Sequence, residues 1–230
     1  MRGLMVVLWF IGVAVLTTDS VLADTWNPTV DFSNVNNPNG AWSYGWMDNS
    51  HFQLFVSSGT NGPDNANGSP IWWGPLAGLP PLQDIRLPAV WLNTGSEVYS
   101  VPPGMLAFHP GPNGEASVMR WTAPTGVSGL GSIQGQFLPG DFGIMQVGVF
   151  EDGDWASPLW TGTDSGTFNL SVPLAAGDTI DFGVYGGYAG GNTLLEATIT
   201  AAVPEPSTLA LLAAGAIGIV GVTWRRRRAA

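Results

Sequence analysis

Apolar and polar residues alternate with a period of two along much of the chain between residues 24 and 202. The alternation is clearest in the segments HFQLFVS (51–57), SIQGQFL (132–138), GTFNLSV (166–172) and DTIDFGV (178–184). A period of two is the pattern of a β-strand with one buried face, because successive side chains point to opposite sides. The positions predicted to face inward are Phe52, Leu54, Val56, Ile133, Gly135, Phe137, Phe168, Leu170, Val172, Ile180, Phe182 and Val184.

Turn-forming residues separate these segments. Sequences rich in Gly, Pro, Asn and Asp, such as PNG, NGPDNANG, HPGPNG, LPGD and AAGD, recur at short intervals, and no amphipathic helical stretch of useful length lies between them. Short strands at such spacing indicate an all-β fold. We therefore predict an antiparallel β-sandwich over residues 24–202, jelly-roll-like, with two packed sheets.

The first 23 residues have the pattern of an export signal. Arg2 precedes the apolar run 4–16, and Ala23 stands before Asp24. A basic start, an apolar run of this length and a small residue at the cleavage position are typical of a secretory signal peptide. We predict a signal-peptide helix in residues 1–23, passage through Sec-type export machinery, and cleavage between Ala23 and Asp24. The alternative is an uncleaved anchor, although the run is short for a membrane span.

The last 28 residues combine the segment VPEPST, a glycine-rich apolar run and four arginines. A helix of 16 residues, 209–224, spans about 24 Å, which is close to the roughly 30 Å of a hydrocarbon core. We predict a transmembrane helix over 208–224, with the basic cluster 225–228 on the cytoplasmic side. The prolines lack a backbone N–H, so we expect Pro204, Glu205 and Pro206 to stay extended outside any strand or helix. The cluster consists of Arg225, Arg226, Arg227 and Arg228.

This three-part tail, residues 203–230, resembles the PEP-CTERM sorting signal of exported bacterial proteins. The resemblance implies that an exosortase, a membrane transpeptidase, handles the chain near Pro204-Glu205-Pro206. The helix would then hold the protein in the inner membrane only transiently, before release to the cell surface or the extracellular space. A proline-containing linker before a permanent anchor is the alternative.

The charge balance excludes one class of partner. Residues 24–202 contain fifteen acidic residues but only two basic ones, Arg86 and Arg120, so the net charge of this part is about −13. Nothing is available to neutralise phosphates, and nucleic acid is therefore an unfavourable partner. The chain has no cysteine, which excludes disulfides, thiolate metal sites and a cysteine nucleophile.

A second resemblance concerns the central region. The segments FHPGPNGEASVMRWTAP, GSIQGQFLPGDFG and LAAGDTIDFGVYGG follow one another in an order similar to that of other exported PEP-CTERM proteins. Those domains look like galactose-binding-like or jelly-roll sandwiches, mostly without an assigned activity. This resemblance covers about residues 102–200 and implies a fold more than a function.

Tryptophan is the most informative residue type in the central region. Trp42, Trp46, Trp72, Trp73, Trp155 and Trp160 occur in loop-flanked or edge-like stretches. Neighbouring residues of a strand face opposite sides, so Trp72 and Trp73 cannot both enter one core. Trp46, Trp72 and Trp73 are candidates for a weak carbohydrate site, where a sugar ring stacks on an indole and Asp48 bonds its hydroxyls. The stronger expectation is that these rings lie in the core or plug the ends of the sandwich.

The acidic turn after the segment GIMQVGVF is a weak calcium candidate. Glu151, Asp152 and Asp154 could supply carboxylate ligands. They lack the spacing of an EF-hand, and an Asp-Gly hairpin turn accounts for them without metal. We therefore predict no firm cofactor.

Two further polar residues have structural and functional interpretations. His109 would need a partnering acid and a nucleophile for catalysis, and the only other histidine is His51, so we expect it to fix a turn through a backbone carbonyl. Arg120 could bind a sugar or a carboxylate, but pairing with an acid of the sandwich is the stronger expectation.

These observations predict an exported surface or matrix protein with a non-enzymatic structural or adhesive role, and weak binding of extracellular polysaccharide. One alternative is a polysaccharide-active lyase or glycosidase, since fifteen acidic residues leave room for a catalytic carboxylate pair. Another is a permanently anchored surface protein.

Overall fold

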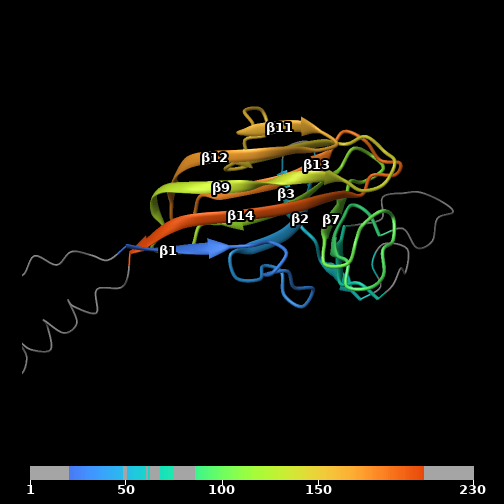
Figure 1. Cartoon of the computed structure of the whole chain (residues 1–230), viewed down its shortest axis with the longest axis horizontal. Coiled ribbons are helices and arrows are strands. Elements are labelled where there is room, and N and C mark those ends of the chain that lie inside the picture. Colours follow the sequence, from blue (N-terminus) through green and yellow to red (C-terminus); the bar gives the residue numbers. More distant parts are fainter. Residues whose placement is uncertain (1–20, 49–50, 61, 63–67, 75–85, 205–230) are drawn as a thin grey trace, which may run out of the picture. The chain divides into compact units, whose positions relative to one another are not determined.

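Figure 1 shows the computed structural model of the chain, which describes residues 21–48, 51–60, 62, 68–74 and 86–204. Residues 23–203 form one compact unit. The predicted transmembrane helix 208–224, Glu205, Pro206 and the basic cluster 225–228 lie outside the described residues, as does the predicted signal peptide up to residue 20. No helix in the described ranges is long and apolar enough to span a membrane.

The described residues form fourteen strands and no helix, so the predicted all-β class is confirmed. Sheet A has eight strands, with β1 beside β14 and the others in the order β12-β9-β14-β7-β6-β5-β4. Its strands are β1 (Val21–Trp26), β4 (Ser57–Gly59), β5 (Ile71–Trp73), β6 (Ala89–Leu92), β7 (Leu106–His109), β9 (Ser128–Pro139), β12 (Gly166–Ala175) and β14 (Thr193–Pro204).

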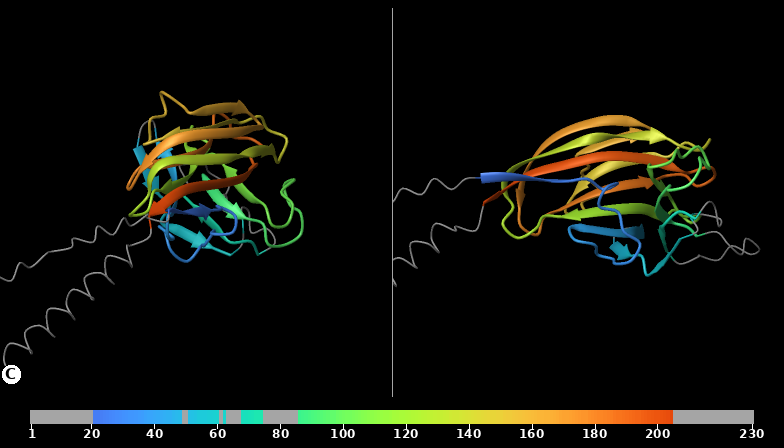
Figure 2. Two further views of the ribbon diagram at one scale, coloured as in Figure 1. Left: turned by 60° about the vertical axis from the view of Figure 1, so that its left-hand side comes forward. Right: turned by 60° about the horizontal axis from the view of Figure 1, so that its bottom comes forward.

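Sheet B has six strands in the order β11-β10-β13-β8-β2-β3. They are β2 (Trp42–Asp48), β3 (His51–Leu54), β8 (Ala116–Thr122), β10 (Gln146–Glu151), β11 (Trp160–Thr163) and β13 (Thr179–Tyr185). The strand pairs whose register is described are all antiparallel. Figure 2 shows the two sheets face to face, which is the predicted sandwich.

The main core lies between the two sheets. The inward positions of β9, β12 and β13 enter it as the period-two pattern predicts, for example Ile133, Phe168 and Phe182. Burying one such side chain stabilises the fold by roughly 1.5–3 kcal/mol. The largest side chains in this core with at most 1 % exposure are Trp42, Tyr44, Phe108, Trp121, Phe137 and Phe182.

The prediction for segment 51–57 is wrong about which side of the strand faces the core. Leu54 is 41 % and Val56 88 % exposed, whereas Phe55 is 2 % exposed in the main core. Phe52 also lies on the outer face of sheet B, against Gly45. The alternation therefore continues with the opposite phase, and Phe55 enters the core where the chain leaves sheet B after β3 and joins sheet A at β4. The Phe55 N–H donates to the Tyr44 carbonyl at 3.0 Å.

The two processing sites predicted from the sequence fall on strands. The predicted cleavage bond between Ala23 and Asp24 falls within β1. Pro204 is the last residue of β14, which corrects the expectation that it stays outside any strand. A proline is tolerated at this position because the ladder ends there and its missing N–H costs no hydrogen bond.

Candidate functional site

Two strands share one edge of β14 and leave an opening between them. β9 pairs with one edge of β14, from Thr193 to Thr200. β7 and β1 therefore both lie along the opposite edge of β14. β7 pairs only with residues 193–195. At the other end, the hydroxyl oxygens of Thr25 in β1 and Thr200 are 3.4 Å apart. Figure 1 shows β1 and β7 beside opposite ends of β14.

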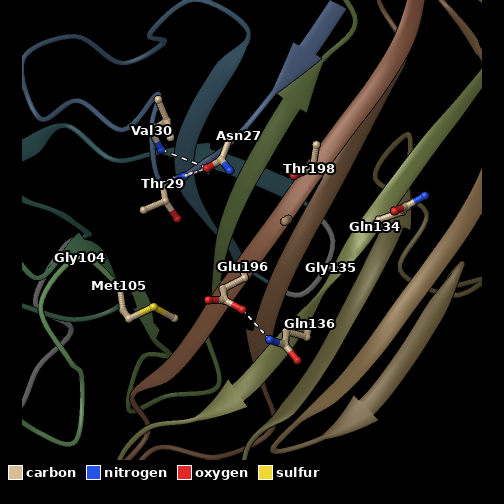
Figure 3. A pocket seen from close by; sticks show the side chains of 11 residues that line it. Asn27, Thr29, Val30, Gly104, Met105, Gln134, Gly135, Gln136, Glu196 and Thr198 are labelled. Atoms are coloured by element: carbon tan, nitrogen blue, oxygen red, sulfur yellow. Dashed lines mark hydrogen bonds between the residues drawn. The ribbon is translucent and has the colours of Figure 1, made fainter.

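A groove of about 680 Å³ occupies this opening and extends over the outer face of sheet A. In Figure 3, side chains from β9 and β14 lie on one side, and the turn after β1 and the turn before β7 lie on the other. The residues that line it are Asn27, Thr29, Val30, Gly104, Met105, Gln134, Gly135, Gln136, Glu196, Ala197 and Thr198.

The floor of the groove is a row of polar side chains held in register. Gln136 lies opposite Glu196, and Gln134 lies opposite Thr198. Gln136 Nε2 donates a hydrogen bond to Glu196 Oε2 at 2.5 Å, and Gln134 Nε2 donates to the Ser132 hydroxyl at 3.0 Å. These side chains point outward because their strand neighbours fill the core.

The opposite wall is a turn built around one asparagine. Asn27 Oδ1 accepts hydrogen bonds from the N–H groups of Thr29 at 2.9 Å and Val30 at 3.1 Å, which is an Asx turn. Asp31 Oδ2 accepts from the Asn27 N–H at 3.1 Å. The turn leaves the Val30 side chain 80 % exposed at the rim, and Met105 adds a second apolar surface.

The lining suits a neutral, hydroxyl-rich ligand. It offers amide and hydroxyl groups, which both donate and accept hydrogen bonds, and two apolar side chains for C–H surfaces. Among the described lining residues Glu196 is the one carboxylate, and none is basic. Glycoside hydrolysis normally needs two carboxyl groups about 5–9.5 Å apart, so this lining does not supply the usual pair.

The tryptophans predicted as a carbohydrate platform do not lie together. Trp46 belongs to sheet B and packs against the main core. Trp72 is only 6 % exposed. It stacks on Tyr44 with ring centroids 6.0 Å apart and donates its indole N–H to the Ser33 carbonyl at 2.6 Å, so its ring faces are not open to a ligand.

Trp73 faces the other side of sheet A from Trp72, as the alternation requires. It packs beside a smaller cluster of buried residues that includes Trp91, and the Arg86 guanidinium lies 5.0 Å from its ring centroid. Asp48 is the last residue of β2, in sheet B. The predicted platform residues are therefore distributed over both sheets.

The carboxylates of the acidic turn after β10 accept hydrogen bonds from backbone N–H groups. Asp152 Oδ1 accepts from the Thr179 N–H at 2.8 Å, and Asp154 Oδ1 accepts from the Ala156 N–H at 3.0 Å. Burial, together with the charges of Asp152 and Asp178, raises the pKa of Glu151. Within the described ranges no group of three His, Cys, Asp or Glu side chains is placed to hold a metal ion, and calcium remains only a prediction.

His109 has a structural position. Its Nδ1 lies 2.8 Å from the Pro110 carbonyl oxygen, and its Nε2 accepts the Gly191 N–H at 3.3 Å. Because a carbonyl can only accept, this arrangement requires the proton on Nδ1. The side chain is 8 % exposed and fixes the end of β7 against the 191 turn, as expected for a turn-fixing histidine.

The sequence did not reveal the groove, although the alternation predicted which way two of its floor residues point. The alternation already places Gln134 and Gln136 on the outer face of their strand. However, the groove also needs residues 27–30, 104–105 and 196–198, which are far apart in the chain. Only strand pairing brings these segments together.

Comparisons with known proteins identify the tail. The PEP-CTERM protein-sorting motif matches residues 202–228, so the predicted sorting signal is confirmed. This motif indicates export and a cell-surface or extracellular location. No curated protein matches the chain by sequence.

Solved structures with partial likeness include two family 35 carbohydrate-binding modules. The module from Clostridium thermocellum is 11 % identical, with a TM-score of 0.29, over 41 % of this chain and 75 % of that chain. The module from an environmental isolate is 19 % identical, with a TM-score of 0.27, over 40 % and 70 %. Arthrobacter globiformis T6 isomalto-dextranase, complexed with panose, is 9 % identical, with a TM-score of 0.27, over 79 % and 32 %. TM-scores this low do not establish a shared fold or function.

Proposed function

We propose that this protein is a non-enzymatic component of the cell surface or extracellular matrix that binds neutral polysaccharide through the groove on sheet A. The observation that carries the proposal is the floor of the groove, where Gln134, Gln136, Glu196 and Thr198 present outward polar groups in register. A polysaccharide offers many hydroxyl groups and apolar C–H faces, and both kinds of surface have counterparts in the lining.

The charge of the groove favours uncharged sugars. Glu196 contributes a carboxylate, and residues 24–202 carry a net charge of about −13. An anionic polysaccharide would be repelled by this charge. The one carboxylate of the described lining also favours binding over hydrolysis, since the usual mechanism requires a second carboxyl group.

The targeting segments complete the proposal. Residues 1–23 act as a cleaved signal peptide, and helix 208–224 with the basic cluster 225–228 holds the chain in the inner membrane until an exosortase acts near Pro204-Glu205-Pro206. The sorting match supports this order of events. Mass spectrometry of the exported protein should find a new N-terminus at Asp24 and no residues 208–230. An intact C-terminus would mean a permanent anchor.

Binding is tested with the exported protein on a panel of neutral, amino and uronic polysaccharides. We expect retention by a neutral member, and a 2- to 10-fold loss of affinity for each of Gln134→Ala and Gln136→Ala, because each removes a hydrogen-bonding group worth about 0.5–1.5 kcal/mol. Asn169→Ala is the matched control, since Asn169 is exposed on β12 opposite Gln134 but does not line the groove. If no polysaccharide binds, or if Asn169→Ala weakens binding equally, the groove is not the site.

A further inference from the structure

The outer face of sheet B carries aromatic rings where a solvent-facing strand would normally carry polar residues. A row of small residues crosses the middle of this face: Gly148 pairs with Gly183, Gly183 with Val118, and Val118 with Gly45. Glycine contributes no side chain, so the row forms a shallow trough in the sheet surface.

Three aromatic rings fill this trough. A Cβ atom on Gly45 would lie 2.6 Å from the Phe52 ring, one on Gly148 would lie 2.5 Å from the Phe150 ring, and one on Gly183 would lie 2.5 Å from the Trp155 ring. The glycines therefore leave room for the edges of these rings to approach the sheet backbone closely.

Trp155 is a partly exposed member of this layer. Its ring stacks on Phe150 with centroids 4.1 Å apart and planes 7° from parallel, and Tyr185 meets it edge-on at 5.4 Å. Phe150 is 1 % exposed, whereas Trp155 is half-buried. Phe150 covers one face of the indole, and Trp155 also packs against the buried cluster of Met47, Ala116 and Val118. The part of the indole left by these contacts is open to solvent.

A buried ion pair lies beside the indole. Arg120 Nε and Nη2 donate to Asp181 Oδ1 and Oδ2 at 2.6 and 2.8 Å, and the Trp155 indole N–H lies 3.5 Å from Asp181 Oδ2. Arg120 keeps 19 % of its side-chain surface exposed, and its guanidinium carbon lies 4.1 Å from the Phe52 ring centroid. In the described ranges Arg120 Nη1 has no hydrogen-bond partner. Its two N–H groups can therefore donate to a ligand.

We propose that this surface, Trp155 with Arg120 and Phe52, is a second saccharide site. A pyranose ring packs its C–H face on the exposed part of the Trp155 indole, and Arg120 Nη1 donates hydrogen bonds to its hydroxyl oxygens. The ligand class rests on the proposed function, but the site does not share a residue with the groove. A flat ring beside a fixed planar donor matches one sugar unit and is too small for a stable protein interface.

The two sites lie on opposite faces of the sandwich, because the main core separates the outer faces of sheets A and B. One protein molecule therefore binds two polysaccharide chains at once. This geometry assigns a cross-linking role in the matrix, in which strength comes from many bridges rather than from one tight contact.

The test uses the exported protein and neutral glucans, namely maltopentaose, cellopentaose, dextran and mixed-linkage β-glucan. Titration with a pentasaccharide that binds should give two sites per molecule, and Trp155→Leu should lower the affinity of one of them about tenfold, whereas Trp155→Phe keeps part of it. Trp160→Leu is the matched control: Trp160 is also half-buried, but it stacks on Phe137 at 6.0 Å, away from this surface. Unfolding midpoints of all variants show that the fold is kept.

Turbidity of the long glucans tests the bridging. The unaltered protein should precipitate them, while Trp155→Leu and the groove variant Gln134→Ala/Gln136→Ala should each bind without precipitating. If Trp155→Leu changes neither the stoichiometry nor the turbidity while the groove variant abolishes all binding, the second site is wrong and the proposed function stands. If Trp155→Leu instead dissociates a dimer in sedimentation, the surface binds a second copy of the chain and the inference is overturned. No binding by any form would overturn both.

Discussion

The buried ion pair between Arg120 and Asp181 provides a sharp test of how sheet B is held together. The Asp181 side chain has 0 % exposure and the Arg120 side chain 19 %. Replacing Arg120 with methionine keeps an unbranched, partly apolar side chain but removes the charge, which leaves the Asp181 carboxylate buried with the Trp155 N–H nearby, at 3.5 Å. Removing one partner of a buried pair costs about 3–5 kcal/mol.

We expect Arg120→Met to lower the free energy of unfolding by this amount at pH 7, measured by urea unfolding followed through tryptophan fluorescence. An unpaired buried carboxylate favours its protonated form. The variant should therefore recover part of the loss as the pH is lowered from 7 to 5, because its folded state takes up a proton that the unfolded chain does not. The double variant Arg120→Met/Asp181→Val, which removes both charges, should be closer to the unaltered protein than Arg120→Met alone.

Three results would refute this reasoning. A loss below about 1 kcal/mol would mean that the pair is screened like a surface salt bridge. An equal loss at pH 7 and pH 5 would mean that no buried charge is left behind. A double variant no more stable than Arg120→Met would mean that the cost comes from lost packing on Phe52 rather than from an unpaired charge.

Further variants test the groove floor, the core and the acidic turn. Gly135→Ala should destabilise the protein by about 1–3 kcal/mol in urea unfolding, because its Cβ would clash with the Glu196 carbonyl oxygen of β14 and lie 2.8 Å from the Phe168 ring; an unchanged midpoint would show that β9 and β14 can separate freely. Burial raises the pKa of Tyr44 to about 12, so the unfolded chain loses this proton first and stability should fall as the pH rises from 10 to 12. Tyr44→Phe should flatten that alkaline decline, and a parallel decline would assign it to another group. Since burial and the nearby Asp152 raise the pKa of Glu151, Glu151→Gln should be slightly more stable at pH 7, by at most about 0.5 kcal/mol, and the gain should vanish near pH 4; a variant less stable at pH 7 would contradict this.

Much of the candidate site lay beyond sequence reasoning. Local alternation oriented Gln134 and Gln136 outward correctly. It could not show that Glu196 lies opposite Gln136, because 60 residues separate them and only the pairing of β9 with β14 brings them together. The tryptophan hypothesis had the same weakness: alternation separated Trp72 from Trp73, but it could not show that Tyr44 and the Ser33 carbonyl cover Trp72.

The aromatic surface of sheet B illustrates the same limit. Gly45, Gly148 and Gly183 occur in three separate segments and carry no shared signal in the sequence. Their role appears only when β2, β8, β13 and β10 lie side by side and the three glycines fall into one row. Phe52, predicted to face the core, instead covers this row from the outside.

The sequence by itself determined the class of the fold, the inward side of most strands and the sorting signal at the C-terminus. These features depend on neighbouring residues: a period of two, the turn residues between strands, and a motif read in linear order. Tertiary structure alone decided which sheet each strand joins, where the chain crosses between sheets at Phe55, and which distant segments form the groove. The physical reason is that strand pairing depends on long-range contacts, and any alternating strand can pair with many others until the whole core selects one arrangement.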